Sequence, residues 1–216
     1  MFFRKLSLKL TPPKVLRHLY YLAHSIHKAF ERHHILYFLE FGSAVGAIRH
    51  AGIIPWDDDL DIVIREEDES FFLDKVHSEL SKNSSIKVRK GVPDGVWSYK
   101  IYSSLDQSLS YLACDVFVIN RKNQSLGNGY TFKNKVPRNW WPHYYDDVTL
   151  TPTLTKFGDF QMRILPSNAY INFDREYGKN WRHIAQTAHS DHRTDTQLIP
   201  MTFLIPPSMK IDSNKE

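Results

Sequence analysis

Two aspartates two positions apart, Asp59 and Asp61, have the spacing that most directly suggests chemistry. They alternate with apolar residues over 59–64, which is the pattern of a half-buried strand. Residues two apart on a strand share a face and lie about 6.6 Å apart along its axis. Two carboxylates placed in this way can bind one hard cation or bridge two, so the spacing predicts a site for Mg²⁺ or Mn²⁺.

A bare Asp-x-Asp pair also occurs on solvated surfaces, so its context matters. Gly42 and Ser43 follow an apolar run at 35–41 and precede a predicted short helix at 44–50. Glycine lets a phosphate approach the backbone, and a serine with the free amides of a helix start can bind that phosphate. A Gly-Ser pair is also an ordinary turn. A strand, Gly-Ser, a helix and then a strand with Asp-x-Asp form a more specific pattern.

These residues need a scaffold of alternating helices and strands, and the hydrophobic periodicity supplies one. The sequence predicts helices at 13–33, 44–50, 66–80 and 168–177, strands at 35–41, 59–64, 86–89, 96–102 and 112–119, a loop region at 120–154 and a hairpin at 157–165. The expected fold class is α+β, with a mixed β-sheet flanked by helices.

Composition and charge limit the classes of function. Hydrophobic residues make up 42% and charged residues 24% of the 216 positions, which suits a globular chain rather than a disordered one. A single cysteine, Cys114, excludes an internal disulfide and favours a reducing compartment, although it is also explained as a buried apolar residue. No apolar run is long enough for a transmembrane helix and no secretory signal is visible, so we expect a cytoplasmic protein.

The net charge of +4 is unevenly distributed. The segment 57–69 contains eight acids and one base, which leaves a charge of +11 on the remainder. A basic body around an acidic pocket suits a metal-bound anionic substrate, whereas no nucleic-acid-binding motif is visible. The basic start of the chain leaves peripheral contact with a membrane open.

The central block resembles the LicD family of phosphotransferases, which includes relatives of fukutin. The residues that carry the resemblance are Gly42-Ser-Ala-Val-Gly-Ala-Ile-Arg-His50 and Gly52-Ile-Ile-Pro-Trp-Asp-Asp-Asp-Leu-Asp-Ile62, with weaker matches at 99–101, 114–117, 157–166 and 177–178. The resemblance covers roughly 20–185. One departure is Phe41, which stands where many members have another glycine.

The resemblance implies a nucleotidyltransferase-like fold and a division of the chain into three parts. Residues 1–12 would be a flexible basic N-terminus, 13–185 the LicD-like domain and 186–216 a partly disordered extension. It also implies a CDP-alcohol donor, CDP-choline being the familiar case, and a glycan or glycolipid acceptor. The enzyme would transfer the phospho-alcohol to an acceptor hydroxyl and release CMP.

The acids of such a site would have different roles in metal binding and proton transfer. Asp59 and Asp61 would hold Mg²⁺ or Mn²⁺ against the donor phosphates, and Asp115 would complete the metal site and accept the acceptor's proton. Asp115 could instead be an ordinary acid at a strand end. Asp57 and Asp58 would assist the metal or shape the turn before the strand.

Two basic residues are candidates for phosphate binding, together with Gly42 and Ser43. Arg49 would hold a phosphate through its planar guanidinium, or form a salt bridge to the acidic segment. Lys100 alternates off an apolar face and would reach the same phosphates, or be a surface lysine.

Three other functions remain open for the same residues. A nucleotidyltransferase would transfer the nucleotide itself and share the same acids. A glycosyltransferase with a metal-binding Asp-x-Asp usually has a larger nucleotide-binding region before that motif. A degenerate relative would bind metal and nucleotide without turnover.

Overall fold

The computed structural model describes residues 10–82, 85–91, 98–103, 106–121, 129–134, 145–146, 150–165, 171–186, 190–191, 196–197 and 202–205. Its helical elements are α1 (Pro13–Arg32), α2 (Phe41–His50), α3 (Glu66–Phe71), the π-helical turn η1 (Phe72–Val76), α4 (His77–Lys82), the 3₁₀ turn η2 (Gln107–Leu109) and α5 (Ile171–Glu176). Its strands are β1 (Tyr37–Leu39), β2 (Leu60–Arg65), β3 (Ile86–Lys90), β4 (Tyr99–Ser103), β5 (Ala113–Arg121), β6 (Gly129–Phe132), β7 (Tyr145–Asp146), β8 (Thr153–Phe157), β9 (Phe160–Ile164), β10 (Ile184–Gln186), β11 (Ser190–Asp191), β12 (Thr196–Gln197) and β13 (Thr202–Leu204).

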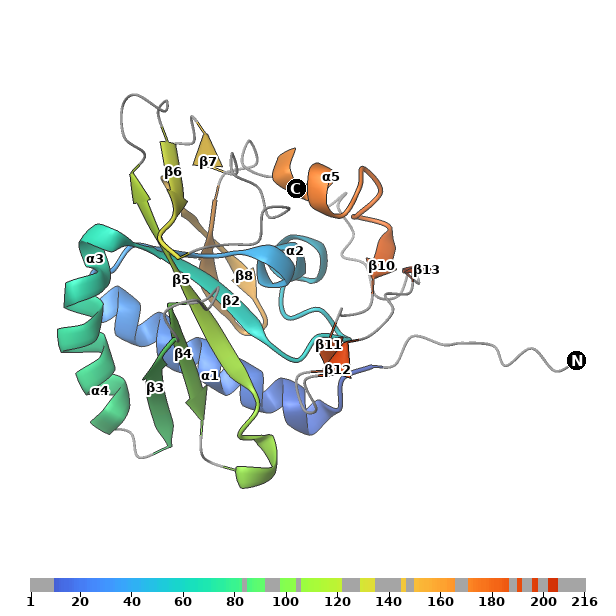
Figure 1. The fold of residues 1–216 in the computed structure, drawn as a ribbon. Helices are drawn as coiled ribbons and strands as arrows, with labels where there is room; N and C mark the ends of the chain where they lie inside the picture. The colour runs from blue at the N-terminus through green and yellow to red at the C-terminus, as the bar shows by residue number, and fades with distance from the viewer. Residues whose placement is uncertain are drawn as a thin grey trace, which may run out of the picture.

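The main sheet has the strand order β1-β2-β5-β4-β3, and β6 and β7 extend it from β5. β2 and β5 are parallel, and the other pairs in this sheet are antiparallel. The predicted α+β class with a mixed sheet is therefore confirmed (Figure 1).

The long helix α1 packs against one face of the sheet (Figure 1). It begins with Pro13, whose fixed φ suits the first turn, and its apolar positions recur at helical spacing. They join alternate residues of β2, β4 and β5 in the larger core. A smaller cluster of buried residues, which includes Val63, Phe117 and Phe132, occupies the opposite face.

Helix α2 begins three residues earlier than predicted, at Phe41 instead of Ala44. Glu40 caps it, since its side chain accepts a hydrogen bond from the Phe41 N–H at 3.2 Å. Phe41 has a φ of 47°, a left-handed conformation that favours glycine. Gly42 and Ser43 thus belong to the first helical turn.

The prediction of a loop over 120–154 is wrong where the structure describes that segment. β5 continues to Arg121, and β6 and β7 add strands to the sheet. The segment's polar residues, glycines and prolines obscured these short strands, because β6 is held by pairing with β5, and β7 by pairing with β6, rather than by local preference.

The ends of the described chain contact the central domain. Thr11 donates its N–H to the Pro55 carbonyl at 2.8 Å. β10 pairs with β13 across the boundary expected at 185–186, and the Ile205 N–H bonds to the His183 carbonyl at 3.0 Å. The predicted tail after Ile205 and residues 1–9 lie outside the described residues. Among the described helices, none combines the length and the apolar character needed to cross a membrane.

Candidate active site

Two of the predicted acids face each other on adjacent parallel strands. Asp61 of β2 is in register with Asp115 of β5, and strands that pair in this way lie about 4.8 Å apart. Their neighbours Leu60 and Cys114 are buried on the opposite face, in the larger core. Asp59 lies just before β2, so the two acids that share a face in the sheet are Asp61 and Asp115, on two adjacent strands.

The acids repel one another strongly. The pKa of Asp61 is well above its usual value, first because the carboxyl loses solvent and then because Asp59, Asp115, Asp57 and Glu40 are near. The pKa of Asp57 is also well above its usual value, through loss of solvent and then through Asp59, with which it shares a hydrogen bond. The site thus concentrates negative charge that a cation or protons must offset.

The start of α2 is tied to this acidic strand. The Ser43 hydroxyl accepts the Asp61 N–H at 2.9 Å, and the Glu40 N–H bonds to the Asp61 carbonyl at 3.1 Å. A Cβ at Gly42 would lie 2.9 Å from the Asp57 Oδ2. Gly42 therefore gives room to a carboxylate, and Ser43 fixes Asp61 while its own hydroxyl hydrogen can still donate.

Lys100 lies beside the acids, and its role at the donor phosphates stays a prediction. It is paired with Asp115 in the β4–β5 register, and its Nζ lies 3.0 Å from the Asp115 Oδ1. Both side chains are partly exposed, at 32% for Lys100 and 18% for Asp115. The strand pair thus brings one cation to the acidic face, within reach of a substrate that approaches from solvent.

Arg49 lies at the opposite end of α2 from Gly42 and Ser43. The buried guanidinium Nη1 donates to the carbonyls of Trp181 at 2.7 Å and Ile184 at 3.0 Å. Loss of solvent lowers the Arg49 pKa to about 10, although Asp57 opposes that shift. The structure therefore places Arg49 as a clamp on the segment after α5, and its role at a phosphate stays a prediction.

The sequence analysis gave no role at the site to two residues of this region, although Tyr177 belongs to the 177–178 match. Glu40 is buried, with 2% of its surface exposed, although it lies in the apolar run predicted as a strand. Tyr177 follows α5, and burial followed by the charges of Glu176, Asp61, Glu40 and Asp57 raises its pKa well above the usual value. A lone acid at the end of an apolar run was the available signal for Glu40. Apart from the 177–178 match, nothing in the local sequence indicated that Tyr177 lies near the acids.

The oxygen-rich composition of the site suits a hard cation such as Mg²⁺ or Mn²⁺, which would relieve the repulsion among its carboxylates. Within the described ranges, however, no three acidic, histidine or cysteine side chains are already arranged as a metal-ligand set. The fit therefore rests on the type and charge of the donors at Asp59, Asp61 and Asp115.

The block that contains these acids also determines the family. A family model described as LicD/FKTN/FKRP, nucleotidyltransferase domain, matches residues 34–163, which is more than half of the chain. The chain belongs to the LicD/FKTN/FKRP family. The predicted LicD resemblance is confirmed, and the match lies within the range of roughly 20–185 on which it was based.

Individual relatives are similar over different lengths. The uncharacterized protein RP689 of Rickettsia prowazekii is 29% identical over 162 residues, which are 74% of this chain and 53% of that protein. The lipopolysaccharide cholinephosphotransferase LicD of Haemophilus influenzae is 35% identical over 66 residues, 31% of this chain and 25% of that one. The human ribitol 5-phosphate transferase FKRP is 47% identical over 58 residues, 27% of this chain and 12% of that one. The chain thus spans about half of RP689 and smaller shares of the other two.

Proposed function

We propose that this LicD-family protein is a metal-dependent transferase that moves a phospho-alcohol from a CDP-alcohol to a hydroxyl group of a glycan or glycolipid. The observation that carries the proposal is the register of Asp61 with Asp115, beside Asp59 and with Lys100 on Asp115. The names of two relatives, a cholinephosphotransferase and a ribitol 5-phosphate transferase, favour a phospho-alcohol as the transferred group.

Asp59, Asp61 and Asp115 would hold Mg²⁺ or Mn²⁺. When bound, the ion would offset charge on the donor phosphates and on the phosphoryl group in transfer. Ser43 would donate its hydroxyl hydrogen to a donor phosphate oxygen while it keeps Asp61 in place. Lys100 would neutralise a second phosphate oxygen from the other side of Asp115.

Asp115 would act as the base in the displacement. It accepts the proton of the acceptor hydroxyl while the acceptor oxygen forms its bond to phosphorus. The bond between that phosphorus and the CMP oxygen breaks, so CMP leaves with the bonding electron pair. Arg49 would contribute indirectly, because its bonds to the Trp181 and Ile184 carbonyls hold the segment that carries Tyr177 close to the acids.

The experiment that tests this proposal combines calorimetry with product analysis. We expect CDP-choline or CDP-ribitol to bind only with Mn²⁺ or Mg²⁺, and CMP to be released when a glycan acceptor is added. Asp61→Asn should lower kcat by about a thousandfold, as when a group that stabilises transition-state charge is removed. The matched control is Asp74→Asn, which changes an exposed acid of η1 and should leave turnover unchanged.

The competing functions give different results in the same assay. Preferential binding of CTP, with labelled nucleotide on the acceptor, would replace the proposal with nucleotidyl transfer. Preferential binding of UDP-glucose would indicate glycosyl transfer. Metal-dependent binding without any turnover would identify a binding module.

A further inference from the structure

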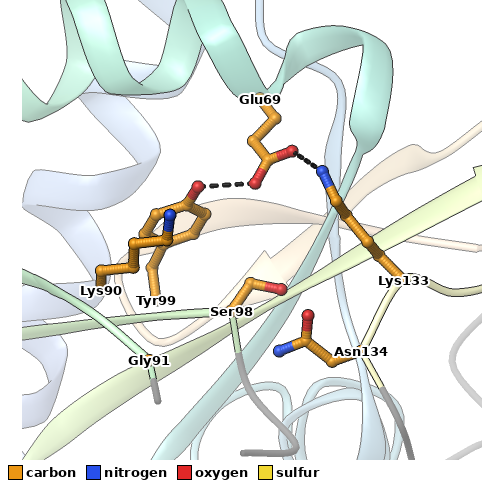
Figure 2. Close-up of a pocket in the computed structure, with 7 residues that line it drawn as sticks. All are labelled: Glu69, Lys90, Gly91, Ser98, Tyr99, Lys133 and Asn134. Atoms are coloured by element: carbon orange, nitrogen blue, oxygen red, sulfur yellow. Dashed lines mark hydrogen bonds and ion pairs between the residues drawn. The ribbon is translucent and has the colours of Figure 1, made fainter. Parts of the chain in front are cut away.

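A second polar site lies beside β5, at the point where one edge of this strand stops pairing with β4 and begins to pair with β6. Ile119 of β5 pairs with Arg65 of β2 on one side and with Phe132 of β6 on the other. β6 therefore pairs with the same edge of β5 as β4 does. β4 pairs with β5 only as far as Val116. A cavity of about 230 Å³ opens between the start of β4 and the end of β6, beside α3 (Figure 2).

The carboxylate that lines this cavity is fully engaged. Glu69 of α3 accepts the Tyr99 hydroxyl hydrogen at 2.6 Å on one oxygen and the Lys133 ammonium at 2.6 Å on the other (Figure 2). Glu66 adds a second contact to Lys133 at 2.9 Å. These two acids raise the pKa of Lys133, Glu69 most, so the lysine stays charged.

The cavity has hydrogen-bond donors that no acceptor among the described residues engages. The Ser98 side chain is buried, with 7% of its surface exposed, and its hydroxyl has no hydrogen-bond partner among the described residues. Lys90 also lines the cavity, and no acid in the described part of the chain pairs with it. A buried hydroxyl without a partner is costly, which favours a ligand that brings acceptor atoms to this position.

We propose that this cavity binds the phosphate group of a small phosphorylated ligand that is distinct from the CDP-alcohol donor. Lys90 supplies the positive charge, because Lys133 is already paired with Glu69 and Glu66. Ser98 donates its hydroxyl hydrogen to a phosphate oxygen. A volume of about 230 Å³ corresponds to roughly eight water molecules at ~30 Å³ each, enough for a phosphate and one sugar ring.

This phosphate site is close to the acids but opposite in character. Ser98 precedes Lys100 by two residues, which is about 6.6 Å along a strand. The acids around Asp115 would repel a phosphate in the absence of a cation, whereas Lys90 of the cavity attracts it. The two sites can therefore be studied separately by removing divalent metal, and the phosphate site does not depend on the proposed transfer reaction.

The test is calorimetric titration of inorganic phosphate, glucose 6-phosphate and glucose in EDTA. We expect the wild type to bind the two phosphates and not glucose. Lys90→Met should weaken phosphate binding by about tenfold, the loss expected for one charged hydrogen bond. Lys87→Met is the matched control, because it removes an exposed lysine from the same strand outside the cavity, and it should bind as the wild type does.

Ser98→Ala separates binding from folding. It should weaken glucose 6-phosphate binding without lowering the melting temperature, because the hydroxyl that it removes makes no hydrogen bond within the described part of the protein. Equal phosphate affinity in the wild type, Lys90→Met and Ser98→Ala, or equal losses in Lys90→Met and Lys87→Met, would overturn the proposal. So would the absence of phosphate binding to the wild type.

A second titration tests whether the phosphate ligand is separate from the donor. With Mn²⁺ and CDP-choline present, glucose 6-phosphate should bind as before, and its displacement by CDP-choline would assign the cavity to the donor. If CDP-choline itself fails to bind, the proposed transferase function fails, while the titrations in EDTA still decide the phosphate site.

Discussion

The two sites lie along the same strand, β5, yet they leave opposite charges uncompensated. Around Asp115 the carboxylates outnumber the cations, and each raises the proton affinity of its neighbours. In the neighbouring cavity beside β5, Glu69 already accepts from Tyr99 and Lys133, while the donors of Ser98 and Lys90 remain. Neighbouring positions along one sheet edge can therefore suit a metal ion at one place and an anion at the next.

The sites also differ in how tightly their surroundings pack. The loop that leads to the acids is held between two helices, since the Ile53 N–H donates to the Tyr20 hydroxyl at 3.0 Å and a Cβ at Gly46 would lie 2.5 Å from the Gly52 carbonyl oxygen. The phosphate cavity instead lies in the space between two strands. We therefore expect substitutions in the packing to affect the acids first.

The largest expected effect comes from Gly46→Ala. The new Cβ would also lie 3.1 Å from the Ile54 N, so the loop must move, and we expect a loss of about 3 kcal/mol in the free energy of unfolding. Metal-dependent nucleotide binding should weaken further than phosphate binding in the same folded protein. Urea unfolding and calorimetry measure the two effects.

Gly178→Ala is the matched control for this substitution. Gly178 has a φ of 77°, but a Cβ added there would meet no described atom within 4 Å, so only the conformational cost of about 1 kcal/mol applies. Equal destabilisation by the two substitutions would show that the close contact at Gly46 does not matter, and would break the contrast in packing.

A smaller effect is expected from pH in the metal-free protein. Because the folded state raises the pKa of Asp57 and Asp61, it binds more protons than the unfolded chain above about pH 4, the usual value for aspartate. The contribution of these acids to stability is therefore greatest in acid and decreases as the pH rises through their folded pKa values. Denaturant unfolding in EDTA, compared between the wild type and Asp61→Asn, isolates this contribution.

Asp61→Asn should gain stability relative to the wild type as the pH rises from 4 to 8, and Mn²⁺ at pH 7 should stabilise only the wild type. A difference that does not change with pH would mean that the acidic site carries no uncompensated charge. In that case the contrast with the phosphate site would disappear.

The smallest expected effect concerns Phe41. Its ring packs on Phe117 and Phe132, with centroids 5.2 and 6.2 Å away, while its backbone is left-handed. Phe41→Gly and Phe41→Ala both remove the ring, but glycine should be more stable than alanine by about 1 kcal/mol because it accepts this φ. Thermal unfolding of the pair checks this, and the usual helix order with alanine ahead would show that the backbone relaxes.

The sequence predicted best what depends on local alternation. The position of Asp61 on β2 and the apolar face behind it follow from a two-residue period, and Lys100 and Asp115 on the neighbouring strands have the same alternation. The start of α2 was harder, since a left-handed phenylalanine is an unusual first helical residue. The glycine that many family members have in its place is explained by the same φ.

Long-range contacts could not be read from the sequence. Arg49 bonds to carbonyls more than 130 residues away, and no local pattern indicated these partners. The phosphate cavity joins residues of α3, β3, β4 and the end of β6, whose proximity depends on strand order alone. No spacing rule within any one of these elements would have selected Ser98.

The arrangement of β4 and β6 end to end on β5 has a consequence for how such a domain can diversify. The register of Asp61 with Asp115 is set where β5 lies between β2 and β4, and β6 pairs with β5 only beyond that point. Connections to and from β6 can therefore lengthen or shorten without shifting Asp115 against Asp61. Since loop closure becomes only slowly more costly with length, this end of the sheet is a place where insertions are tolerated and new acceptor specificities can arise.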